Sequence, residues 1–272
     1  MGGSIPKLTP EEIRRYMMGE SAGLVEHRRL FKRIPAEPRC KLCLVPFGGI
    51  GGAAFRVRGF GRSSNPMLCN KCTVELEKNG LTGVEIPCTL LFSDVRGSTA
   101  LAEKIRPTEF HTFLDRFYRL ATRAVVDHDG IVDKLVGDEV IGLFFGGISG
   151  PDHAGAGIRA ALDLADKAAG PKATPMGPIP VGTAVHTGDA FVGATGLHGS
   201  VEDFTALGDA VNTTARLASA AGPGEVLVSS ASAEAAHLAV EPEEHRVVGI
   251  RGRTEPIEVI VLRVARPVPA AD

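Results

Sequence analysis

The spacing of apolar residues changes several times along the chain from residue 88 onward, and each change predicts a new element. Continuous apolar runs and strict alternation predict strands, whereas apolar residues three and four positions apart predict helices. Glycine and proline divide these segments. In chain order, the predicted elements are a strand at 89–93, a turn at 94–99 followed by a helix through 104, a helix at 107–128, strands at 131–136 and 140–145, a helix at 152–169, a loop at 170–177, strands at 180–186 and 190–194, a helix at 209–220, a strand at 225–229, a helix at 230–238, and strands at 246–248 and 257–264.

This order predicts an α/β fold, in the form of an α+β sandwich with a mixed, mostly antiparallel sheet. Gly137-Asp138 is read as the turn of a β-hairpin, and Thr187-Gly188-Asp189 as the link between two further strands. Cys88 precedes the first of these strands and is expected to be a buried small apolar residue.

The chain begins with a different pattern, typical of a helix. Thr9 can cap the helix, Pro10 suits its first turn, and Glu12 stands at the capping-box position. We expect the helix to reach about Ile34. Its apolar stripe is interrupted by two glycines and consists of Ile13, Met17, Leu24 and Leu30. The helix could pack on its own domain through this stripe or pair with the helix of a second copy, and the sequence leaves both alternatives open.

Four of the five cysteines form two pairs with two residues between partners, Cys40 with Cys43 and Cys69 with Cys72. Two such pairs typically make one tetrahedral site of four sulfurs. Zinc is the first expectation, an iron–sulfur cluster the second and a redox dithiol the third. The glycine-rich insert between the pairs is longer than usual, and we expect it to wrap or shield the metal.

Charge divides the chain at about the same place as the pattern. Residues 1–80 carry 14 Lys and Arg against 7 Asp and Glu, whereas residues 81–272 carry 16 against 25. We therefore predict a helical, metal-binding and regulatory module at 1–80, a connector at 81–87, a catalytic domain at 88–265 and a tail at 266–272.

Composition also excludes some classes. The sequence has no apolar run long enough to cross a membrane and no secretory leader, so a cytoplasmic location is expected. With no Trp and only two Tyr, nucleic-acid binding is not expected.

Two carboxylates follow the predicted strands. Asp94 leaves the strand at 89–93, and Asp138 lies in the hairpin turn. If those strands are neighbours, the two side chains meet and repel unless a cation lies between them. Oxygen ligands of this kind suit Mg²⁺ or Mn²⁺ held with substrate phosphates, and the turn at Gly97, Ser98 and Thr99 offers N–H groups to the same phosphates.

Five motifs in order, across residues 86–265, resemble the class III adenylate and guanylate cyclase catalytic domain. They are LLFSDVRGST, KLVGDEVIGLFF, VGTAVHTGDAFVGATG, DFTALGDAVNTTARLAS and RGRTEPIEVIVL. The resemblance implies an adenylate cyclase that makes 3′,5′-cyclic AMP and pyrophosphate from ATP with two Mg²⁺ or Mn²⁺ per site. It further implies a homodimer whose two chains share each site.

The resemblance assigns a role to each matching position. Asp94 and Asp138 match the two metal ligands, Lys134 and Thr205 the base-contacting pair, Asn212 the ribose-orienting residue and Arg216 the transition-state arginine. Arg253, or Arg251 in an alternative alignment, matches a triphosphate ligand. Lys134 donates, which suits adenine N1, and Thr205 can accept from the 6-amino group. A guanylate cyclase and a catalytically silent, cyclase-like dimerisation or sensory module are the alternatives.

Overall fold

Among the residues that the structure describes, the part of the chain after residue 82 forms one mixed sheet of eight strands, in the order β2-β3-β1-β4-β6-β8-β7, with β5 paired to β4. The computed structural model describes residues 9–63, 66–72, 83–174, 177–197, 201–238, 245–249 and 256–264. Strand β4 runs parallel to β6, and the other pairs are antiparallel, as predicted. The strands are β1 (Gly83–Val95), β2 (Ile131–Val136), β3 (Glu139–Phe145), β4 (Val181–Leu197), β5 (Val201–Leu207), β6 (Glu225–Ser229), β7 (His245–Val248) and β8 (Ile257–Arg263).

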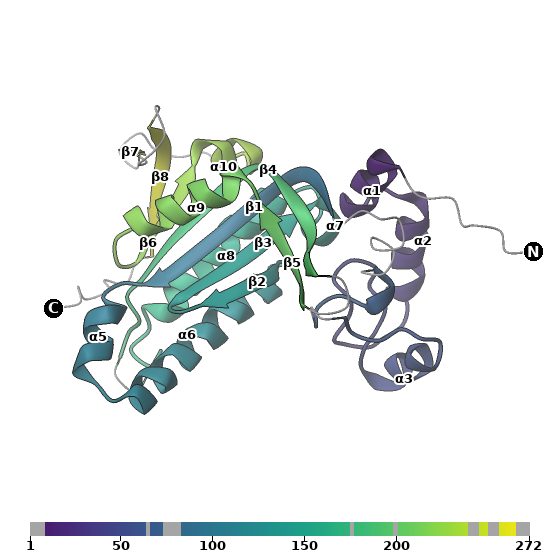
Figure 1. Ribbon diagram of the computed structural model, residues 1–272, viewed down its shortest axis with the longest axis horizontal. Coiled ribbons are helices and arrows are strands. Elements are labelled where there is room, and N and C mark those ends of the chain that lie inside the picture. The colour runs from purple at the N-terminus through teal and green to yellow at the C-terminus, as the bar shows by residue number, and fades with distance from the viewer. Residues whose placement is uncertain are drawn as a thin grey trace, which may run out of the picture.

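Helices cover both faces of this sheet (Figure 1). Alternate residues of β1 face opposite sides: Leu90 and Phe92 pack in one core with α9, and Leu91 packs with α8 on the other face. The helices of this region are α5 (Ser98–Lys104), α6 (Pro107–Asp127), α7 (Gly146–Ser149), α8 (His153–Ala168), α9 (Asp209–Ala220) and α10 (Ser230–Ala235). Cys88 is fully buried, which raises the pKa of its thiol to about 12, as befits a core residue.

Two predictions for the strands were wrong. Residues 181–197 form one strand, not two, because β1 pairs with β4 straight through the expected turn, with Cys88 opposite Gly188 and Pro87 opposite Asp189. Residues 83–87, expected in the connector, belong to β1. Strand β5 was not anticipated, and it carries Thr205.

The N-terminal helix also differs from the prediction, because it is two helices, α1 (Pro10–Met17) and α2 (Ala22–Phe31). The capping box is confirmed: Thr9 and Glu12 exchange hydrogen bonds at 2.7 and 3.2 Å. The break falls at Gly19, which adopts φ +79°, a conformation that glycine allows. Ile13, Met17 and Leu24 pack into the core of their own chain, whereas Leu30 is exposed, so most of the stripe is buried internally.

A third helix, α3 (Gly49–Val57), lies in the glycine-rich insert between the cysteine pairs, where no helix was predicted. Phe55 holds it in place through edge-to-face contacts with Phe31 at 5.0 Å and Phe60 at 5.7 Å. No helix in the described part of the chain is long and apolar enough to cross a membrane.

The N-terminal unit contacts the segments that precede β2 and follow β3, at the open end of the β2–β3 hairpin. Lys41 Nζ donates to the carbonyl of Val126 at 2.8 Å and pairs with Asp129 at 3.0 Å, just before β2. Arg28 donates to the carbonyl of Gly147 at 2.7 Å, just after β3. In Figure 1 this unit lies beside α7, at the end of the sheet opposite α5. The unit is therefore attached to the hairpin that carries several candidate site residues.

Candidate active site and metal centre

Asp94 and Asp138 lie on neighbouring segments of backbone, because β1 pairs with β3. Asp94 is opposite Glu139 in the sheet, and the N–H of Val95 donates to the carbonyl of Asp138 at 3.2 Å. The hydroxyl of Ser98, the first residue of α5, donates to the Asp138 carboxylate at 2.5 Å. This end of the sheet therefore carries two acidic residues, and one of them, Asp138, is oriented by Ser98.

The turn that follows β1 bends at Gly97, whose φ of +73° lies in the left-handed region. Ser98 is buried and faces Asp138, whereas Thr99 is exposed. Arg251 and Arg253, the predicted triphosphate ligands, lie outside the described residues.

Arg96 supplies positive charge to this acidic edge, and sequence reasoning did not give it a role. Its guanidinium forms an ion pair with Asp94 and also donates to the carbonyl of Ser219 on α9 at 3.1 Å. Burial lowers the pKa of Arg96, while Asp138 and Glu139 act in the opposite direction. Burial and the charge of Asp138 raise the pKa of Glu139, so negative charge is concentrated here.

These residues fit a hard divalent cation. Asp94 and Asp138 offer carboxylate oxygens, the ligands that Mg²⁺ and Mn²⁺ prefer. Within the described residues, no third His, Cys, Asp or Glu joins them in a compact ligand cluster. Such a pair suits an ion that takes its remaining ligands from water and substrate phosphates.

Lys134 and Thr205 meet although they come from different strands. Lys134 Nζ donates to Thr205 Oγ1 at 2.8 Å, bringing β2 and β5 together. A third residue completes the group: Asp133 accepts from Lys134 Nζ at 3.1 Å and from Thr205 Oγ1 at 2.8 Å. Asp133 was missed because neighbouring residues of a regular strand point to opposite faces. The pairing of β2 with β3 shifts register between Val132 and Lys134, an irregularity that interrupts this alternation.

Asn212 and Arg216 lie one turn apart on α9 and are both exposed. Spacing of four residues places them on the same face of the helix. The helix itself is held by Ala210, Leu217 and Ala218, which are buried against β1 and β4.

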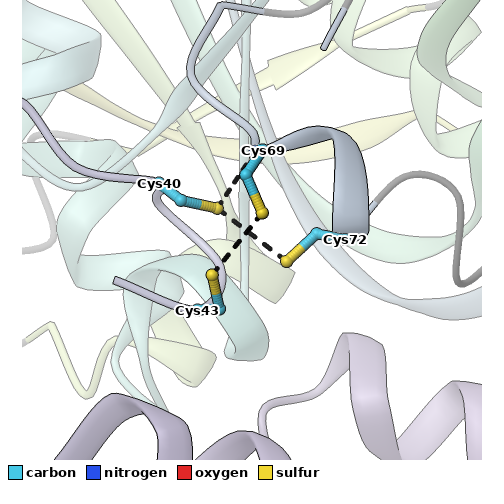
Figure 2. Close-up of side chains that lie close together, drawn as sticks. All are labelled: Cys40, Cys43, Cys69 and Cys72. Atoms are coloured by element: carbon cyan, nitrogen blue, oxygen red, sulfur yellow. Dashed lines mark hydrogen bonds between the residues drawn. The ribbon is translucent and has the colours of Figure 1, made fainter. Parts of the chain in front are cut away.

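The four paired cysteines converge, as Figure 2 shows. All four are buried, and their sulfurs lie within 4.8 Å of one another. The Sγ atoms of Cys40 and Cys72 are 3.9 Å apart, and those of Cys43 and Cys69 are 3.7 Å apart. Hydrogen bonds from the other three thiols, Cys43 first, lower the pKa of Cys40. Such a buried cluster of four potential thiolates fits a soft or borderline cation.

Two neighbouring groups donate to these sulfurs. The hydroxyl of Tyr16 on α1 donates to Cys72 Sγ at 3.2 Å, and the N–H of Cys69 donates to Cys40 Sγ at 3.3 Å. Burial raises the pKa of Tyr16, which keeps its proton available for this bond. The first helix is therefore linked directly to the cysteine centre.

A model of the adenylate and guanylate cyclase catalytic domain matches residues 85–262, and the chain belongs to this family. The chain is 29% identical over 157 residues to an adenylate cyclase of Anabaena cylindrica, covering 54% of this chain and 31% of that protein. The crystal structure of the guanylyl cyclase Cya2 superposes with a TM-score of 0.62 at 26% identity, covering 70% of this chain and 99% of that one.

The adenylyl cyclase CyaB of P. aeruginosa shares the fold, with a TM-score of 0.60 at 23% identity, covering 70% of this chain and all of that one. The chain spans about a third of the length of the Anabaena relative. Similar proteins thus include both adenylyl and guanylyl cyclases. The family model begins at residue 85, so the cysteine-bearing unit lies outside the family domain.

Proposed function

We propose that the chain is an adenylate cyclase that converts ATP into 3′,5′-cyclic AMP and pyrophosphate. The observation that carries this proposal is the contact between Lys134 and Thr205 at 2.8 Å. An ammonium group can donate to adenine N1, and a hydroxyl can accept from the 6-amino group. Guanine carries a proton at N1, which an ammonium group cannot accept, so a lysine facing N1 is poorly matched to guanine.

At the turn end of the hairpin, Asp94 and Asp138 are placed to hold the metal ions that would bind the phosphates and the attacking hydroxyl. Asp94 and Asp138 would hold two Mg²⁺ or Mn²⁺ ions, with Ser98 orienting Asp138. When bound, such ions lower the pKa of a coordinated hydroxyl and neutralise phosphate charge. The N–H groups at Gly97, Ser98 and Thr99, together with Arg253, are the residues we assign to the triphosphate.

Asn212 and Arg216 complete the set from the exposed face of α9. We assign Asn212 to the ribose, where an amide can hold the sugar so that its 3′-oxygen faces the α-phosphorus. We assign Arg216 to the charge that develops on the α-phosphoryl oxygens as pyrophosphate leaves, since a guanidinium binds two such oxygens at once.

We infer that two chains share each site. Lys134 lies within β2, whereas Asp138 lies in the turn that follows this strand. Lys134 bonds to Thr205 on β5, whereas Asp138 bonds to Ser98 on α5, and Figure 1 shows α5 and β5 near opposite ends of β2. We therefore expect Lys134 of one copy to contact the base of a nucleotide, and Asp138 of a second copy to hold the metal ions at its phosphates.

Mixing inactive variants tests catalysis and sharing together. Asp94→Ala and Arg216→Ala should each abolish most activity, and their mixture should regain it, because one site of the mixed dimer keeps every residue. Arg123→Ala, at an exposed ion pair on α6, is the matched control and should keep wild-type activity. The absence of recovery in subunits shown to exchange would contradict the shared site.

For the cysteine centre we propose a single zinc ion. Four sulfurs about 2.3 Å from one tetrahedral ion lie about 3.8 Å apart, close to the separations of 3.7 and 3.9 Å observed here. An iron–sulfur cluster spreads its cysteine ligands around several iron and sulfide ions, which needs wider spacing.

We propose further that this centre regulates the cyclase through the β2–β3 hairpin. Lys41 stands between Cys40 and Cys43, so the metal fixes the segment from which Lys41 reaches Val126 and Asp129. Tyr16 connects the same centre to α1, which packs against β1 and α7. Loss of the metal would loosen the open end of the hairpin without altering any residue of the active site.

A further inference from the structure

Asp133 lies behind the two residues that we assign to the base. Its side chain is 5% exposed and makes an ion pair with Lys134 Nζ at 3.1 Å through Oδ1. Its other oxygen, Oδ2, accepts from Thr205 Oγ1 at 2.8 Å. One buried carboxylate thus touches both base-contacting side chains.

The bond to Asp133 determines which way the Thr205 hydroxyl faces. A hydroxyl has one proton to donate and two lone pairs to accept with, whereas a carboxylate only accepts. The Thr205 proton therefore lies on the Asp133 side; the carbonyl of Ala206, at 3.4 Å, is a weaker alternative. Lys134 Nζ occupies one lone pair, which leaves the other for a further donor.

We propose that Asp133 is a positioning residue that makes the site prefer adenine over guanine, an inference that rests on the proposed adenylate cyclase function. With its proton held by Asp133, Thr205 can accept from the 6-amino group of adenine. The 6-oxo group of guanine would meet an acceptor in the same place, and a buried pair of acceptors is unfavourable. Asp133 also holds the Lys134 ammonium toward the base.

Replacing the carboxylate by an amide reverses this arrangement. In Asp133→Asn the side-chain NH₂ can donate to Thr205 Oγ1, which frees the Thr205 proton to donate to guanine O6. The variant keeps the size of the side chain and loses only its charge and its acceptor-only character. The preference for adenine should therefore fall, rather than the affinity for all nucleotides falling equally.

The test measures the dissociation constants of 3′-deoxy-ATP and 3′-deoxy-GTP for the whole chain with Mg²⁺, because neither analogue can be cyclised. Wild type should bind the adenine analogue more tightly, and Asp133→Asn should reduce the ratio of the two constants about tenfold or more. Asp115→Asn is the control: it also removes one carboxylate from an ion pair, on the exposed surface of α6, and should leave the ratio unchanged.

If Asp133→Asn does not fold, Asp133→Glu and Asp133→Gln repeat the comparison with side chains one methylene longer. The glutamate should keep the adenine preference and the glutamine should lose it. An unchanged ratio in the amide variants, an equal loss of both affinities, or a wild type without preference would overturn the proposal. If the wild type prefers the adenine analogue, Asp133→Asn loses this preference and ATP is never cyclised, the result would contradict the proposed function while still supporting the role of Asp133.

Discussion

Glu225, the first residue of β6, accepts several hydrogen bonds at a position away from the active site. Arg246 on β7 donates to both of its oxygens at 2.8 Å, and Arg263 on β8 donates to one of them at 2.5 Å. The N–H of Gly222 adds a bond at 3.0 Å. The carboxylate therefore joins three strands at one end of the sheet.

These contacts give the stability a defined pH dependence. The hydrogen bonds, that of Arg246 first, lower the pKa of Glu225 to about 2 from its ordinary value of 4.5. The carboxylate thus stabilises the folded chain above pH 4.5, and this contribution is lost as the pH falls toward 2. Glu225→Gln should lower the free energy of unfolding by about 1 to 2 kcal/mol at pH 7 and by much less at pH 3. Urea denaturation measures both, and equal losses at the two pH values would contradict the assignment.

At the residue scale, the sequence predicts most of the site but not its support. The predicted strands place Asp94 and Asp138 on neighbouring segments, and the pairing of β1 with β3 confirms that these segments are adjacent. Asp133 and Arg96 were not foreseen, because their roles depend on a shift of strand register and on the approach of α9. Neither feature has a local sequence signal.

At the scale of elements, the errors came from local signals that long-range pairing overrides. Gly188-Asp189 is read as a turn, yet the neighbouring β1 pairs straight through it, and Thr187 bonds to Thr89 across the pair at 2.8 Å. Amphipathic helices were predicted well, because burial of one face is written in the spacing of their residues: α6 ends one residue before the expected limit.

The close packing of α1 on α7 can be tested with two glycines. A methyl group added at Gly147 would lie 2.0 Å from the carbonyl oxygen of Met17, so the backbone must move. Gly147→Ala should therefore lower the free energy of unfolding by about 1 to 3 kcal/mol. Gly23→Ala, in open space on α2, should raise it by about 0.5 to 1 kcal/mol. Thermal and urea unfolding measure both; a neutral Gly147→Ala would show that the two helices are not in close contact.

At the scale of the whole molecule, composition predicted two units, but not how they are joined. Residues of the N-terminal unit, such as Met17, Leu42 and Phe31, share one apolar core with Ile86 and Leu90 of β1. A change of charge along a sequence indicates a change of role. The contact between two units depends on how their surfaces fit together, which the charge pattern does not predict. The cysteine-bearing unit therefore packs directly against the sheet.

Removal of the metal should reveal this coupling. We expect about one zinc per chain in a colourless protein, and a chelator should speed amide hydrogen exchange in residues 126–136 while leaving β6 protected. Lys41→Met should produce part of the same change with zinc still bound, since it removes the contacts to Val126 and Asp129. Visible absorption typical of iron and sulfide, or an equal response of β2 and β6, would contradict the zinc-dependent coupling.

The most direct test of the proposed activity is to identify the product formed by the 272-residue chain when ATP and GTP are supplied together at equal concentration with Mn²⁺ or Mg²⁺. Chromatography with mass detection should find cyclic AMP and pyrophosphate as the main products, with cyclic GMP much lower, and Asp94→Ala should form neither nucleotide. A folded dimer that forms no cyclic nucleotide, or mainly cyclic GMP, would contradict the account.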